Sequence, residues 1–377
     1  MTTEKGRLLS ELYKINDPRI NRHKRHKLLD ILAITICASI CSANTWEQIE
    51  QYGNAKYEWL STFLELPNGI PSHDTIRRVF ILIDPDEFRV AFINWIEAIK
   101  NLMQNEVVSI DGKTLRGSHN KRDGKAAIHM VSAWASEMNM VLGQVKTEEK
   151  SNEITAIPEL LELLEVSGCI VTIDAMGCQK KIAAKIIEKN ADYVLALKKN
   201  QETLHDDVEL YFQDAKKTDF KDIQHSYYKT IDGDHGRIEE RRHWVVSDID
   251  WLDAKPLWKG LNSIGMVERE RDINGKVSCE TTYYILSQKC NGKVFADSAR
   301  KHWGIENKLH WGLDVSFRED ECRKRIGNGT ENFAIVRHIA LNLLKQENSM
   351  RKNINTKRLQ AGWDNIYLMK VLGVNTF

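Results

Sequence analysis

The spacing of apolar residues changes near residue 104 and divides the chain into two parts. Before this point apolar residues recur every three or four positions, as at Phe88, Phe92 and Trp95, which is typical of amphipathic helices. After it, short runs rich in β-branched residues at 107–111, 127–135 and 140–146 indicate strands. We therefore predict a small all-α domain over residues 1–103, followed by a domain that contains a β-sheet.

The second part alternates between the two kinds of pattern. The three strands are followed by a helix, a strand that ends at Asp174, a second helix, a further strand and a third helix, at residues 157–166, 169–174, 179–190, 193–197 and 201–212. This order predicts an α/β fold, a mixed sheet with helices on both faces.

Residues 224–296 depart from that alternation. They are rich in β-formers and contain two turn signals, Asp232-Gly233 and Asn274-Gly275. We predict a β-rich insertion here, inside a domain that spans residues 104–345. Residues 346–377 are expected to form a C-terminal tail.

Three acidic residues stand out from their surroundings. Asp111 and Asp174 each close an apolar strand-like run, and Glu306 lies in a helical pattern. Carboxylate oxygens are preferred ligands of hard divalent cations, and two such ions can hold the attacking and leaving oxygens of a phosphoryl transfer. The interval from Asp174 to Glu306 is about twice that from Asp111 to Asp174, so the insertion must lie between them if all three are to meet.

Each of these residues has a structural alternative. Asp111 precedes a glycine and could form an Asp-Gly turn, and Asp174 could cap the helix that follows it. Glu306 could belong to a core helix with His302 and His310 at its rim. These two histidines and Glu306 could also bind zinc, although they lack the His-Glu-x-x-His arrangement of metalloproteases.

Basic residues surround these candidates. Solvated surface is the default interpretation, but beside carboxylates that require an anionic substrate they become candidate phosphate contacts. The candidates for DNA binding are Lys113, Arg116, Lys198, Lys199, His235, Arg237, Arg300, His302 and His310, together with Arg22, Lys24, Arg25 and Lys27 in a basic run near the N-terminus.

Composition adds little beyond the class of protein. The 377 residues are 42% hydrophobic and 28% charged with a net charge of +1, which is ordinary for a globular chain. The most apolar segment, residues 28–43, is shorter than the ~20 residues that span a bilayer, so we expect a buried helix and no membrane partner. Seven cysteines, an odd number, favour reduced thiols and a cytoplasmic location.

Six ordered motifs make the chain similar to a known family. Residues 69–75, 110–117, 172–179, 191–198, 235–239 and 302–320 resemble the H-repeat-associated insertion-sequence transposases of bacteria. The resemblance implies a ribonuclease-H-like catalytic domain with a β insertion, preceded by a helical domain. It also implies that Asp111, Asp174 and Glu306 are the metal-binding catalytic residues.

One departure from the wider pattern concerns the helix of Glu306. Related cut-and-paste transposases often have tyrosine, arginine and lysine where this chain has Ala299, His302 and Leu313. His302 is therefore a candidate to replace the phosphate contact of the arginine.

The expected function is that of a DNA transposase. Two Mg²⁺ ions, with Mn²⁺ as a substitute, would support strand cleavage and strand transfer on double-stranded DNA at element ends and target, and a homodimer on DNA is a possible assembly. Two alternatives remain open: a nuclease that cuts without joining, and an inactive DNA-binding protein derived from a transposase.

Overall fold

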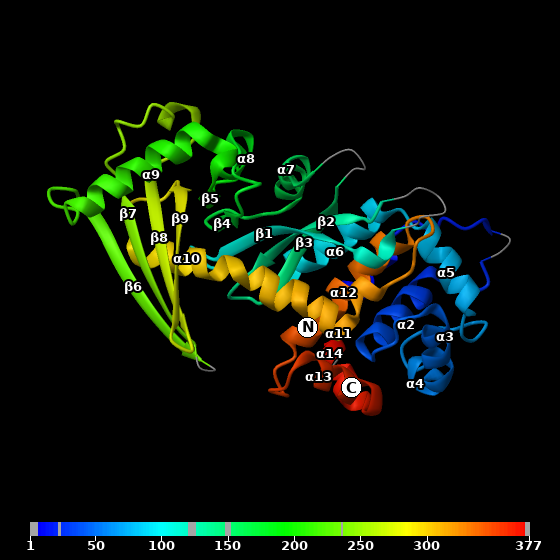
Figure 1. The fold of residues 1–377 in the computed structure, drawn as a ribbon. Helices are drawn as coiled ribbons and strands as arrows, with labels where there is room; N and C mark the ends of the chain where they lie inside the picture. The colour runs from blue at the N-terminus through cyan, green and yellow to red at the C-terminus, as the bar shows by residue number, and fades with distance from the viewer. Residues whose placement is uncertain (1–6, 22–23, 120–125, 148–151, 235–236, 374–377) are drawn as a thin grey trace.

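The computed structural model describes residues 7–21, 24–119, 126–147, 152–234 and 237–373. Its centre is one sheet of nine strands in the order β3-β2-β1-β4-β5-β9-β8-β7-β6 (Figure 1). The strands are β1 (Val107–Thr114), β2 (His129–Ala135), β3 (Met140–Lys146), β4 (Ile170–Ile173), β5 (Asp192–Leu197), β6 (His225–Asp234), β7 (Arg237–Val246), β8 (Ser263–Ile273) and β9 (Lys276–Leu286). The predicted mixed α/β fold is confirmed at this level.

The sheet mixes parallel and antiparallel pairs. Strands β1, β2 and β3 form an antiparallel meander, whereas β4 and β5 run parallel to β1. Strand β9 then pairs antiparallel with β5, and β6–β9 continue as antiparallel hairpins. The predicted β-rich insertion is therefore not a separate layer, because its last strand joins the central sheet directly.

Helices cover both faces of the central strands. Ile170 and Val194 pack with Phe295 of α10 (Gly292–Gly304) in one cluster, while their strand neighbours Val171 and Leu195 belong to the main core. That core also receives α7 (Glu153–Leu163) and α8 (Lys180–Glu188). Since successive strand residues point to opposite faces, α10 lies on one face and α7 and α8 lie on the other.

The N-terminal helices gather at the end of the molecule opposite to β6–β9 (Figure 1). They are α1 (Arg7–Tyr13), α2 (Leu28–Ile40), α3 (Trp46–Ala55), α4 (Tyr57–Leu60), α5 (His73–Leu82) and α6 (Pro85–Ile99). Helix α12 (Gly329–Gln346) contacts α2, α5 and α6 and also the strand β3. One hydrophobic core therefore runs through the helical segment and the sheet.

Local sequence signals explain several helix starts. Thr45 and Gln48 form a capping box at α3, Asp84 caps α6 immediately before Pro85, and Asn291 caps α10. The apolar segment that follows Lys27 is the buried helix α2, as its length predicted. No helix in the described ranges is long and apolar enough to cross a bilayer.

Two details differ from the sequence-based predictions. Residues 346–377 were expected to be a tail, but α13 (Ile354–Trp363) and α14 (Asn365–Leu372) bury Ala361 and Leu368 in the core. Asp232-Gly233 is not a turn, because both residues pair with β7. By contrast, Asn274 and Gly275 both have positive φ and connect β8 to β9, as predicted for a two-residue hairpin turn.

Asn342 joins α12 to the edge of the sheet. Its side-chain amide donates to the carbonyl of Val141 and accepts from the amide of Val141, at 2.9 Å in each case. The side chain therefore pairs with the edge strand β3 as a neighbouring strand would. The pair is fully buried, so water cannot replace these two hydrogen bonds.

We therefore expect Asn342→Ala to lower the free energy of unfolding by ~2–4 kcal/mol, since two buried backbone groups lose their partners. Chemical denaturation monitored by circular dichroism measures the change. Asn355→Ala at an exposed position of α13 is the matched control, and it should stay within ~0.5 kcal/mol of wild type. Equal losses in the two variants would contradict the role of Asn342.

Candidate active site

Asp111 and Asp174 lie side by side where parallel pairing between β1 and β4 ends. The last paired residues are Ile110 and Ile173, and each aspartate immediately follows one of them. Asp111 does not end its own strand, contrary to the sequence-based prediction, because β1 continues to Thr114 alongside β2. The parallel register alone therefore brings together two residues that are far apart in sequence.

Glu306 reaches the same edge from a helix with an irregular turn. Helix α10 continues into the π-helix η6 (Ile305–His310) and then into α11 (Trp311–Phe317). Ile305 and Leu309 of this turn are buried, whereas the Glu306 side chain is exposed. Single π-helical turns within longer helices often occur at functional sites.

All three carboxylates line one groove of about 740 Å³ between the sheet and the α10–η6 helix. His302, Arg300 and Lys198 line it as well. The structure thus brings together the three residues that the sequence singled out across two long intervals.

Burial and neighbouring negative charge raise the pKa values of the two aspartates. Burial is the main cause that raises the pKa of Asp111 to about 7, and the charges of Glu153, Asp174 and Glu306 add to it. The pKa of Asp174 is also raised, chiefly by burial, although the amide of Gly177 opposes the shift. The groove therefore concentrates negative charge that lacks full compensation.

Asp174 accepts hydrogen bonds from backbone amides, but it is not the N-cap residue of α8. Its Oδ1 accepts from the amides of Met176 at 3.0 Å and Gly177 at 3.2 Å. Helix α8 begins only at Lys180, with Gln179 as its N-cap residue. The carboxylate therefore shapes the turn after β4, and its second oxygen faces no backbone amide among the described hydrogen bonds.

Glu153 is a fourth acidic residue near Asp111, and the sequence-based analysis missed it. It is the first residue of α7, which begins four residues earlier than predicted, and its Oε1 lies 2.7 Å from Nε2 of His129. A Cβ atom at Gly112 would lie 2.2 Å from this oxygen. The glycine after Asp111 therefore leaves room for the His129–Glu153 pair behind the strand.

His302 is half-buried against the sheet. Its Nδ1 lies 3.0 Å from the hydroxyl of Thr172 on β4, and burial lowers its pKa to about 4. The imidazole is therefore neutral at pH 7, so the expected phosphate contact through an imidazolium ion is not favoured in this structure.

His310 is buried, and its Nδ1 lies 3.6 Å from Oδ2 of Asp111. Burial is the first cause that lowers its pKa to about 4, with Lys113 as a second. This inward position beside Asp111, outside the residues that line the groove, does not favour the predicted contact between His310 and DNA.

Lys113 is also withdrawn from the groove. It forms ion pairs with Asp314 and with Glu319, the latter at 3.0 Å, and only 12% of its side chain is exposed. Glu319 in turn lies 3.5 Å from the buried Arg337. These ion pairs do not favour the predicted role of Lys113 in DNA binding, because they tie the side chain to α11 and to the segment after it.

Strands β7 and β8 place arginines on the opposite wall of the groove. Arg241, Arg269 and Arg271 line it and surround the buried Glu239, with nitrogen–oxygen distances of 2.6, 3.8 and 3.5 Å. Sequence reasoning missed Arg269 and Arg271. The signal was present in residues 268–271, where glutamate and arginine alternate at the period of a strand and so place both arginines on one face.

The remaining basic candidates have varied positions. Arg300 is 3.7 Å from Asp232, while Arg116 is 83% exposed and lies 3.5 Å from Asp320, outside the groove. Lys199 is exposed next to Lys198, and Arg237 belongs to β7. His235 lies outside the described residues.

The N-terminal basic run is partly neutralised. Lys24 lies 3.8 Å from the carboxylate of Asp17, and Lys27 pairs with Glu65. Arg25 is exposed, and Arg22 lies outside the described residues. The run therefore offers less free positive charge than its sequence indicates.

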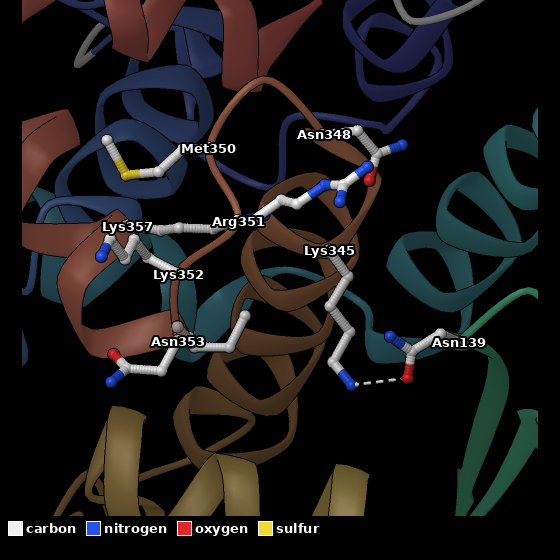
Figure 2. Close-up of a pocket in the computed structure, with 9 residues that line it drawn as sticks. Asn139, Lys345, Asn348, Met350, Arg351, Lys352, Asn353 and Lys357 are labelled. Atoms are coloured by element: carbon white, nitrogen blue, oxygen red, sulfur yellow. Dashed lines mark hydrogen bonds between the residues drawn. The ribbon is translucent and has the colours of Figure 1, made fainter.

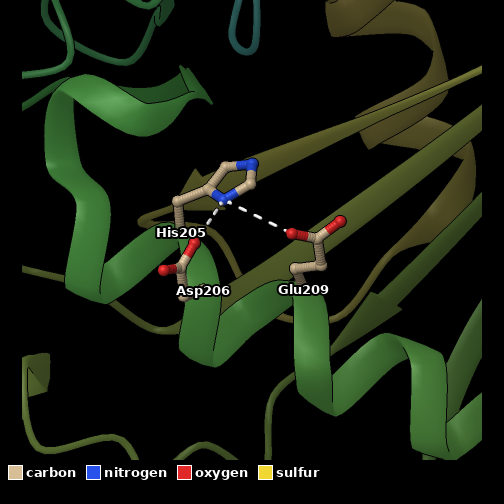
Figure 3. A group of neighbouring side chains, drawn as sticks. All are labelled: His205, Asp206 and Glu209. Atoms are coloured by element: carbon tan, nitrogen blue, oxygen red, sulfur yellow. Dashed lines mark hydrogen bonds and ion pairs between the residues drawn. The ribbon is translucent and has the colours of Figure 1, made fainter.

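A second acidic cluster lies on α9 (Glu202–Lys217). His205, Asp206 and Glu209 are the only described group in which three metal-ligating atoms lie within 4.8 Å of one another (Figure 3). All three come from one helix, and the ring of His205 packs against Tyr283. The carboxylates of the groove are consequently more widely spaced than the ligands of a closed single-ion site.

Comparison with known proteins identifies the class. Residues 103–343 match the family described as "Transposase DDE domain", and residues 9–96 match "DDE_Tnp_1-associated". The chain therefore belongs to the DDE transposase family, and the resemblance seen in its motifs is confirmed.

Individual relatives are similar over nearly the whole length. "Putative transposase YncI" of Escherichia coli O157:H7 is 43% identical over 97% of this chain and 94% of its own. "H repeat-associated putative transposase YhhI" of Escherichia coli strain K12 is 41% identical over 98% of both chains. A solved piggyBac transposase synaptic complex with hairpin DNA is 12% identical, with a TM-score of 0.44 over 98% of this chain and 80% of that chain.

The raised pKa of Asp111 predicts a pH-dependent stability without metal. Between pH ~4 and ~7 Asp111 stays protonated in the folded chain but is ionised in the unfolded chain. The stability that the bound proton contributes is therefore full below the unfolded pKa and is lost as pH rises through about 7. The stability of wild type relative to Asp111→Asn should therefore fall across this window, by at most ~4 kcal/mol. Denaturant titrations with chelator at several pH values measure it. Asp253→Asn, at an exposed position, serves as control. Parallel curves of stability against pH for wild type and Asp111→Asn would contradict the raised pKa of Asp111.

The position of His302 predicts the effect of restoring the arginine of related enzymes. We expect His302→Arg to lower the free energy of unfolding by ~1–3 kcal/mol, because a guanidinium ion would be buried and the bond to Thr172 would be lost. Thermal and chemical unfolding measure the loss, with the exposed His225→Arg as control. Unchanged stability together with a flatter pH profile of DNA cleavage would instead support a phosphate contact.

Proposed function

We propose that this protein is a DNA transposase that cleaves DNA at the ends of an insertion-sequence element and transfers the freed strand to target DNA. The observation that carries this proposal is the groove in which Asp111, Asp174 and Glu306 face arginines of β7 and β8. Family membership agrees with it.

The central strands support a ribonuclease-H-like catalytic domain. The three-stranded meander followed by two strands parallel to β1 places Asp111 and Asp174 at one edge, and the helix that continues from α10 into η6 brings Glu306 to it. The N-terminal helices would form the associated domain, although they share their core with the sheet.

The donor set suits hard divalent cations. Carboxylate oxygens are the ligands that Mg²⁺ and Mn²⁺ prefer, and the raised pKa of Asp111 reports negative charge that a cation would neutralise. We expect two such ions, as in other phosphoryl-transfer sites that hold a pair of metals. When bound, such a pair activates a water or a 3′-hydroxyl as nucleophile and stabilises the leaving oxygen.

The residues of the chain would position the DNA. Arg241, Arg269, Arg271, Arg300 and Lys198 line the groove and supply positive charge opposite the carboxylates. Arginine binds phosphate through two parallel hydrogen bonds, so these side chains would fix the backbone while the scissile phosphate lies against the carboxylates.

Two alternatives share the same groove. A nuclease would cut without joining, and a protein descended from a transposase could bind DNA without cutting. The chain retains all three carboxylates in one groove, which supports an active enzyme over the second alternative.

Asp174→Ala tests the proposal. We expect it to reduce Mg²⁺-dependent cleavage of duplexes that carry the terminal sequences flanking the gene by roughly 10³-fold or more, with DNA affinity retained. Glu58→Ala, an exposed residue of α4, should keep full activity. Gel analysis of labelled donor ends measures both cleavage and joining.

Each outcome separates the candidates. Cleavage with joined product supports the transposase, and cleavage without it indicates a nuclease. Wild-type activity in Asp174→Ala would overturn the assignment of the site, and binding without cleavage by the wild-type protein would indicate an inactive descendant.

A further inference from the structure

A second pocket, of about 440 Å³, lies near the C-terminal end of α12, and four of its nine lining residues are lysine or arginine (Figure 2). Lys345 comes from the last turn of α12, Arg351 and Lys352 from the following segment, and Lys357 from α13. Three asparagine side chains complete its polar lining, and no carboxylate lines it among the described residues. We call this the basic pocket.

Lys345 is held inside the basic pocket by neutral groups. Its Nζ donates to Oδ1 of Asn139 at 3.1 Å and to the carbonyl of Lys308 at 3.2 Å, and it lies 4.2 Å from the centre of the Trp134 ring. Burial lowers the pKa of Lys345 to about 7, with further contributions from Lys308 and Lys357. A partly buried ammonium ion with only such partners is a favourable site for an anion.

The other three cations differ in how far the protein buries them. Lys357 is buried and donates to the carbonyls of Leu344 and Glu347 at the end of α12. Arg351 and Lys352 are exposed, and Figure 2 shows Arg351 near Asn348. Hydrogen bonds within the fold therefore hold Lys345 and Lys357, whereas the exposed Arg351 and Lys352 are free to bind a ligand.

The basic pocket is connected to the catalytic groove through η6. The carbonyl that accepts from Lys345 belongs to Lys308, two residues after Glu306. Glu306, Asn307 and Lys308 are all exposed, and Glu306 and Asn307 line the groove. One short helical turn therefore borders both the catalytic carboxylates and the basic pocket.

We propose that the basic pocket binds a backbone phosphate of the DNA strand that leaves the catalytic groove across η6. This inference rests on the proposed function and adds a second anchoring site to it. A phosphodiester offers several acceptor oxygens to the cations and amides, and the arginine can hold it through two hydrogen bonds. The contact would also fix η6, and with it Glu306, relative to the bound strand.

The test compares two double variants of the full chain. Arg351→Ala/Lys352→Ala removes the two exposed cations. Lys217→Ala/Lys221→Ala, which we call the α9 variant, removes an exposed lysine at the end of α9 and another in the turn that follows, outside both the groove and the basic pocket. Fluorescence anisotropy with a duplex of arbitrary sequence gives Kd over a range of salt concentrations.

We expect the basic-pocket variant to bind more weakly and to have a salt slope smaller by ~1, since one phosphate contact contributes ~0.9. The α9 variant should keep the wild-type slope. Equal slopes for all three proteins would overturn the proposal. Circular dichroism before the titrations establishes that each variant is folded.

A further titration distinguishes a DNA phosphate from free phosphate as the ligand of the basic pocket. Titration of the wild-type chain and the basic-pocket variant with inorganic phosphate shows whether the pocket takes a free anion. Saturable binding lost in the variant, with equal DNA slopes, would assign the pocket to free phosphate and overturn the DNA contact. A wild-type chain that fails to bind DNA would overturn both this inference and the proposed function, whereas unchanged slopes with normal binding overturn this inference alone.

Discussion

The packing of α10 across β4 and β5 is the contact on which the site depends. Phe295 and Ala299 of the helix lie in one apolar cluster with Ile170 and Val194 of the strands. Ile170 lies four residues before Asp174, and Val194 lies four residues before Lys198. The position of α10 along these strands therefore sets where η6 places Glu306 relative to the edge of the sheet. Glu306 therefore reaches the aspartates because the apolar side chains of α10, more than one turn before it, pack on β4 and β5.

Given that scaffold, the site can concentrate charges that repel one another. Asp111, Asp174 and Glu306 share a groove, and Glu153 adds its charge from behind β1. Two groups beside Asp111 that could neutralise it do not: Lys113 pairs with Asp314 and Glu319, and burial keeps His310 neutral. The folding free energy of the whole chain must offset this repulsion, which leaves the carboxylates available to cations.

The continuity of the sheet gives the groove its opposite wall. Because β9 pairs with β5, the arginines of β7 and β8 are attached to the strand that leads to Lys198. Likewise, α12 connects the N-terminal helices to β3 through one core. The positive wall, the acidic edge and the helical segment are therefore parts of one packed body, and none of them has a core of its own.

The sequence by itself determined the elements and the acidic residues, because these depend on local periodicity and on carboxylates placed at the ends of apolar runs. The hairpin of β2 and β3, the turn at Asn274-Gly275 and the helix of Glu306 all follow from signals a few residues long. Only the tertiary structure decided the partners: that Lys113 and His310 face inward, that Glu153 lies behind Gly112, and that Arg269 and Arg271 face the carboxylates. These outcomes depend on contacts between residues far apart in sequence, and a charged residue pairs inside or faces solvent according to what the fold places opposite to it.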